Sequence, residues 1–68
     1  MSGLVCVEFY GAVDPLDLIA AVDAPKDSAR IWARQIGRML CKMRGRDSLN
    51  VVLLDEYGNT IERMIVVK

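Results

Sequence analysis

Residues 27–44, DSARIWARQIGRMLCKMR, constrain the fold most, because their pattern is that of one amphipathic helix. At about 100° per residue, apolar and basic side chains separate onto two sides. The apolar side carries Ala29, Trp32, Ala33, Ile36, Met39, Leu40 and Met43. The other side carries a ridge of basic residues four apart, namely Arg30, Arg34, Arg38 and Lys42. We therefore expect a helix that packs on strands through one side and keeps a basic ridge outside.

The ends of this helix have recognisable signals. Asp27 or Ser28 is placed as an N-cap, and Gly45 is placed to end the helix in a left-handed conformation. Gly37, in mid-helix, costs about 1 kcal/mol relative to alanine. Because it lies one turn after Ala33, we expect these two small residues to allow a strand to approach closely.

Apolar runs on both sides of the helix predict strands at residues 4–10, 49–54 and 61–67. Between the last two runs, the sequence DEYGN predicts a type I turn with Gly58 in a left-handed bulge position. Residues 16–23 are ambiguous. They alternate like a strand, but the preceding Asp14-Pro15 is also a start signal for a short helix. We favour the strand, because eight residues are short for a helix.

These elements predict a single α+β domain over residues 1–68. Two β-hairpins flank one amphipathic helix (ββαββ), in one sheet with the helix on one face. The expected core consists of Val5, Val7, Phe9, Trp32, Ile36, Leu40, Val51, Leu53, Ile61 and Ile65.

One helix covers only one face of such a sheet, and the second face is also apolar. We expect that face to carry Leu4, Cys6, Val52, Leu54, Met64 and Val66. In a chain of 68 residues with 53% hydrophobic side chains, this excess predicts a partner that covers it. A second copy of the chain supplies one without extra sequence, so we expect a homodimer through this face.

The formal net charge of zero conceals a strong segregation of charge. Residues 1–25 hold four acidic and no basic side chains, residues 26–46 have a net charge of +6, and residues 47–68 have a net charge of −2. The helix is therefore basic and the strands acidic.

Catalytic and metal-binding signals are absent. The chain has no histidine, its acidic residues are scattered, and it contains neither a P-loop nor a GxGxxG motif. Two cysteines far apart predict neither a zinc site nor a disulfide framework. Cys41 is a candidate thiol nucleophile because Arg38, Lys42 and Arg44 surround it, but an ordinary half-buried cysteine explains it better. We expect no enzyme activity, no metal and no cofactor.

The basic ridge has three interpretations: a solvated face, a phosphate-binding face, or a face that binds an acidic protein surface. The partner-binding residues are then Arg30, Ile31, Arg34, Arg38 and Lys42. Ile31 favours a protein partner, because an apolar side chain ringed by arginines is typical of protein contacts. A pI of about 6.1 disfavours nucleic acid, which stays the alternative. A membrane-surface role is not expected, because the strands need the apolar side of the helix.

We therefore expect a small homodimeric regulator or inhibitor that binds proteins. Its size and lack of motifs are typical of regulators that phages and mobile elements encode. The N-terminus lacks the features of a signal peptide, no apolar run reaches transmembrane length, and two cysteines suit a reducing compartment. These features predict a cytoplasmic location.

Overall fold

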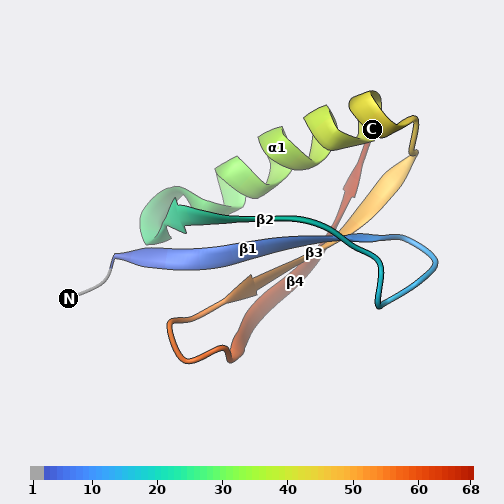
Figure 1. Cartoon of the computed structure of the whole chain (residues 1–68). Coiled ribbons are helices and arrows are strands. Elements are labelled where there is room, and N and C mark those ends of the chain that lie inside the picture. The colour runs from blue at the N-terminus through green and yellow to red at the C-terminus, as the bar shows by residue number, and fades with distance from the viewer. Residues whose placement is uncertain (1–2) are drawn as a thin grey trace.

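A computed structural model describes residues 3–68 as a four-stranded antiparallel sheet with one helix on one face (Figure 1). Its elements are β1 (Leu4–Gly11), β2 (Leu18–Pro25), a 3₁₀ turn (η1, Lys26–Ser28), α1 (Ala29–Arg44), β3 (Ser48–Leu54) and β4 (Thr60–Val67). The predicted ββαββ order and the α+β class are confirmed. The ambiguous segment is a strand, as favoured.

The strand order across the sheet is β2-β1-β3-β4. The first hairpin joins β1 to β2, and the second joins β3 to β4, with β1 and β3 paired in the middle. Because β2 and β3 both run antiparallel to β1, they are parallel to each other, and α1 makes the crossover between them. Figure 1 shows the two hairpins strongly splayed, as expected from the twist that antiparallel strands accumulate.

The helix contacts the sheet through a row of small residues. Ala29, Ala33, Gly37 and Cys41 follow one another at four-residue spacing and all are buried. The largest fully buried side chains below them belong to the sheet: Phe9, Leu49, Val7 and Val51. Large side chains of the sheet thus fit against small side chains of the helix, and this allows a short distance between the two layers.

Gly37 lies directly against β4. A Cβ atom added at Gly37 would be 2.9 Å from Cγ1 of Val66 and 3.1 Å from its Cβ. Val66 is buried and β-branched, so its side chain has little freedom to move aside. The expected close approach of a strand at Gly37 is therefore confirmed.

The orientation of the helix differs from the prediction at Trp32. This side chain was expected in the core, but it is 40% exposed. The row of small residues occupies the position closest to the sheet, so the neighbouring row of large residues is turned toward one flank. Ile36 in that row is half-buried, whereas Met39 and Met43 are exposed.

The register of β4 is the second difference. Leu54 pairs with Thr60, but Leu53 pairs with Glu62, so Ile61 is an extra residue in β4. One extra residue moves all later side chains to the opposite face. Ile61 and Ile65, expected in the core, are consequently exposed. Met64 and Val66 face the helix instead.

The turns follow their local sequence signals. Gly45 ends α1 with φ of 63°, and the N–H of Arg46 donates to the carbonyl of Cys41 at 2.9 Å. In the β3–β4 turn, Gly58 has φ of 81° and its N–H donates to the carbonyl of Asp55 at 3.1 Å. Ser28 lies at the N-cap position but makes no capping hydrogen bond through its side chain.

The contact between Gly37 and Val66 can be tested with a double-mutant cycle. Gly37→Ala should destabilise the wild-type protein by ~1–2 kcal/mol, because overpacking against Val66 outweighs the gain in helix propensity. In a Val66→Ala background the same change should become neutral or stabilising. Chemical denaturation of the four proteins measures this coupling. Gln35→Ala, at an exposed position of the same helix, serves as the control and should change little.

The β3–β4 turn predicts a specific dependence of stability on pH. The backbone N–H of Asn59 donates to the Asp55 carboxylate at 2.8 Å and, with the N–H of Tyr57, lowers the pKa of Asp55 below its ordinary value. A lowered pKa stabilises the fold above the ordinary carboxyl pKa of about 4, and this contribution is lost as pH falls below that value and through the lower pKa of the folded state. Asp55→Asn should remove this part of the acid sensitivity. The same dependence of unfolding free energy on pH in the wild type and in Asp55→Asn would contradict this prediction.

Candidate functional site

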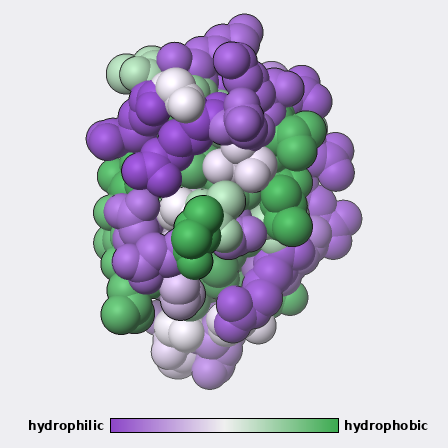
Figure 2. Space-filling model, turned by 90° about the vertical axis from the view of Figure 1, so that its right-hand side faces the viewer, coloured by the Kyte–Doolittle hydropathy of each residue, from purple (hydrophilic) through white to green (hydrophobic). Residues whose placement is uncertain are grey.

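The basic ridge lies on the exposed side of α1 as predicted, but its residues are not equivalent. Arg30 is paired, with both Nε and Nη2 at 2.7 Å from Oε1 of Glu62 on β4. Arg34, Arg38 and Lys42 are exposed, and they form no ion pair with any residue from 3 to 68. Figure 2 shows hydrophilic residues gathered at the top of the molecule, where α1 lies. Three cations of the ridge are therefore available to a partner.

The same helix also exposes large apolar side chains. Ile31 is 58% exposed, and its role as a contact residue stays a prediction. Trp32, Met39 and Met43 follow one another along one flank, and we call this set the apolar flank. Met39 is 51% and Met43 72% exposed.

The side of the helix that carries the apolar flank follows from the ion pair of Arg30. Arg30 faces β4 through Glu62, and Trp32 is two residues later, about 200° further around the helix. The apolar flank therefore points away from β4, toward the half of the sheet formed by β1 and β2. Val22 of β2 faces the helix there and is only half-buried.

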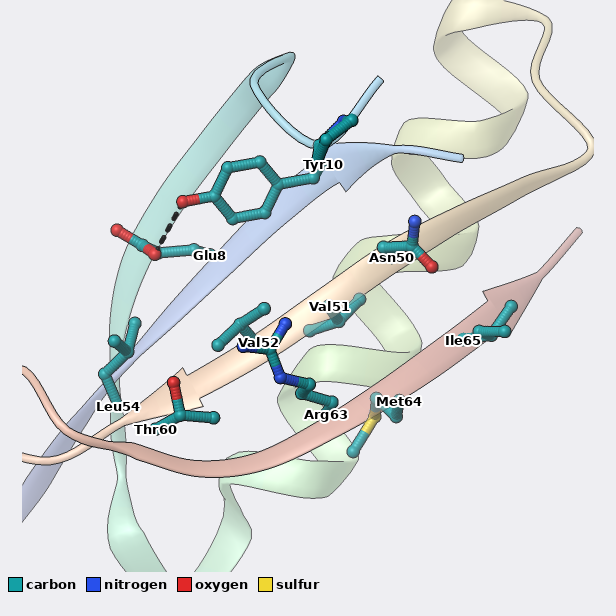
Figure 3. A pocket seen from close by; sticks show the side chains of 11 residues that line it. Glu8, Tyr10, Asn50, Val51, Val52, Leu54, Thr60, Arg63, Met64 and Ile65 are labelled. Atoms are coloured by element: carbon teal, nitrogen blue, oxygen red, sulfur yellow. Dashed lines mark hydrogen bonds between the residues drawn. The ribbon is translucent and has the colours of Figure 1, made fainter. Parts of the chain in front are cut away.

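The second candidate surface is the face of the sheet that α1 leaves open. It is hollowed, with a volume of about 850 Å³, and its lining mixes apolar with polar side chains (Figure 3). Tyr10 donates a hydrogen bond from its hydroxyl to Oε1 of Glu8 at 2.8 Å. This bond, and to a smaller extent desolvation, raises the pKa of Tyr10. Arg63 leans over β3 beside Val52 (Figure 3).

The predicted residues of this open face are only partly in place. Leu4, Cys6, Val52 and Leu54 alternate with buried neighbours along β1 and β3, so they lie on it. The placement of Met64 and Val66 there is wrong, because both pack toward the helix side. The extra residue Ile61 puts Arg63, Ile65 and Val67 on the open face instead. A hairpin with the predicted turn would pair Leu53 with Ile61. No feature of the sequence signals that Ile61 is instead an extra residue in β4.

No group of His, Cys, Asp or Glu within residues 3–68 is arranged to hold a metal ion. Cys41 is fully buried, which separates its thiol from any substrate. Burial raises the pKa of the Cys6 thiol, and the carboxylates of Glu8 and Asp23 raise it further. Among these residues, no helix has the length and apolar character to cross a membrane.

Searches of protein-family models, of curated proteins and of solved structures find no match to this chain. The two surfaces described above are therefore the candidate functional sites.

The environments of the two cysteines predict distinct rates of thiol labelling. Cys6 should react with a maleimide more slowly than a free thiol at neutral pH, and faster as pH rises, because its pKa is raised. Cys41 should react only when the protein unfolds. Mass spectrometry of Cys6→Ser and Cys41→Ser separates the two signals. Rapid labelling of Cys41 in the folded protein at neutral pH would contradict its burial.

Proposed function

We propose that this protein is a small non-enzymatic binding module that docks the exposed side of α1 on an acidic protein surface, as a regulator or inhibitor of its partner. One observation carries the proposal. The helix exposes three cations that form no ion pair within residues 3–68, Arg34, Arg38 and Lys42, and it also exposes a tryptophan and two methionines. Arginine, tryptophan and methionine are the residue types enriched in protein interfaces.

The two parts of this surface would contribute differently to binding. The apolar flank supplies area that a partner removes from water, at about 25 cal/mol per Å². Trp32 and Met39 are partly supported by the fold, so ordering them on binding costs less than ordering a fully mobile chain. The basic ridge supplies orientation and faster association with an acidic surface. A partner that matches both parts would carry an apolar patch bordered by Asp and Glu.

Nucleic acid is the alternative partner, favoured by the line of cations that form no ion pair in the described part of the chain. Two observations weigh against it. The chain has no net charge, so long-range attraction to phosphates is weak. The apolar flank has no role against a phosphate backbone, since phosphate contacts come from charged and polar groups.

Two double variants distinguish these partners. Arg34→Glu/Arg38→Glu and Met39→Ala/Met43→Ala change only exposed side chains, so both should keep the fold and the free energy of unfolding within about 1 kcal/mol. With each protein used as immobilised bait, the same polypeptide should be retained by the wild type and lost from both variants. A salt titration should release it from the wild type.

The nucleic-acid alternative is tested with the same proteins and a labelled 20-base-pair random duplex or a single-stranded RNA of equal length. Tight, salt-dependent binding by the wild type and by Met39→Ala/Met43→Ala, lost in Arg34→Glu/Arg38→Glu, would overturn the proposal in favour of nucleic acid. Unfolding of Arg34→Glu/Arg38→Glu, seen by circular dichroism, would show instead that the ridge is structural.

A further inference from the structure

We propose that two copies of this chain stack through the open faces of their sheets, about a twofold axis parallel to β3, so that Glu8 of each copy meets Arg63 of the other. The surface is on the opposite side of the sheet from α1. The proposal is therefore independent of the binding role of the helix.

The pairing registers place charge and apolar residues in rows across this face. Glu8 on β1 is opposite Val52 on β3, and Val52 is opposite Arg63 on β4. In the next row toward the end of β1, Tyr10, Asn50 and Ile65 are aligned in the same way. Strand β3 is thus a midline, with an acidic residue on one side and a basic residue on the other.

A rotation of 180° about an axis along this midline exchanges the two sides and leaves each row at the same position along the strand direction. Glu8 then faces Arg63 of the second copy, and Val52 faces its own equivalent. Tyr10 faces Ile65 of the second copy in the adjacent row. The face is therefore self-complementary in charge, and every ion pair occurs twice, as in any isologous interface.

The twist of the sheet restricts the axis. A twisted sheet is a saddle, concave along one diagonal and convex along the other. A twofold axis in the plane of the sheet lets two such saddles nest when it runs along the strands or across them. The hollow makes part of this face concave, and the convex diagonal of the second copy would enter it. Stacked sheets in proteins pack in this manner, about 10 Å apart.

Charge decides between the two axes. An axis across the strands would place Glu8 against Glu8 and Arg63 against Arg63, which is repulsive. An axis along β3 brings opposite charges together. Arg63 has no ion-pair partner within residues 3–68, and the hydrogen bond from Tyr10 engages one carboxylate oxygen of Glu8. Both groups are thus available for an intermolecular pair.

The apolar residues of this face provide the reason to associate. Ile65 is 70% exposed, and Val67 and Leu4 are also exposed, on a chain with little core to spare. The overlap is small, since three strands cover only about 14 Å by 25 Å. This footprint, about 350 Å² per copy, is less than half that of a standard interface, so we expect a weak, reversible dimer that forms only at high micromolar concentrations.

A charge-swap experiment tests the axis. Glu8→Arg places two arginines together at each pair, and Arg63→Glu places two glutamates together. Each single variant should weaken dimerisation at least about tenfold in sedimentation equilibrium. The double variant Glu8→Arg/Arg63→Glu should recover the affinity of the wild type. An equimolar mixture of the two single variants should form a heterodimer, because both of its pairs are then of opposite charge.

Arg34→Glu is the matched control, because it changes the net charge as Arg63→Glu does, but on the exposed side of α1. It should leave the dimer unchanged. Glu8→Gln, which keeps a hydrogen-bond acceptor for Tyr10, should weaken the dimer less than Glu8→Arg does. Labelling of Cys6, on the same face, should slow as protein concentration rises.

A mass of 7.6 kDa for the wild type at several hundred micromolar would overturn the proposal and leave the face open to a ligand or another protein. A dimer that is equally stable in Glu8→Arg and in Arg63→Glu would show that the twofold axis does not run along β3. A dimer lost in Met39→Ala/Met43→Ala but kept in Glu8→Arg would place the interface on the helix. A failure of the helix to bind any partner leaves every one of these measurements unaffected.

Discussion

The close approach of α1 to β4 at Gly37 and Val66 is the contact on which the remaining structure depends. It is possible only because small side chains line the helix at four-residue spacing, so that the backbone lies low over the sheet. A helix in this position has no room for Trp32 on the same side. The packing that stabilises the two layers is thus also the reason why the apolar flank reaches the surface.

Local signals in the sequence predicted the elements of the fold well. Strands β1, β3 and β4, the helix, its end at Gly45 and the turn at Gly58 each follow from a few adjacent residues, and all are confirmed, whereas the local signals for β2 were ambiguous with a short helix. The rotation of the helix does not follow from such signals. Periodicity identifies an apolar side about half a circumference wide, but only the shape of the sheet decides which row within it is nearest. The row of residues that contains Trp32 and Met39 is more hydrophobic, whereas the row that contains Gly37 fits the surface of the sheet better.

Which residues of β4 lie on each face of the sheet could not be predicted, for a related reason. Side chains of a strand alternate, so a single extra residue exchanges the two faces completely. Ile61 is that residue. It is neither a glycine nor a proline, the residue types that often mark an irregularity in a strand. Its effect is chemical as well as geometric. It packs Met64 and Val66 on the helix side, where Val66 is buried and Met64 half-buried, and brings Arg63 to the open face, opposite in charge to Glu8. The charge complementarity proposed for the dimer exists only because of this bulge.

The two proposed surfaces belong to opposite sides of a molecule that is only one sheet and one helix thick (Figure 1). Stacking the open faces would leave both copies of α1 on the outside, one on each side of the dimer. Each dimer would then present two identical basic helices that cannot reach the same site on a small partner. Such an arrangement favours partners that are themselves oligomeric, since a second contact then forms at a high effective concentration. Weak dimerisation and weak docking would reinforce each other, because a bivalent partner that holds two chains also raises the local concentration for stacking.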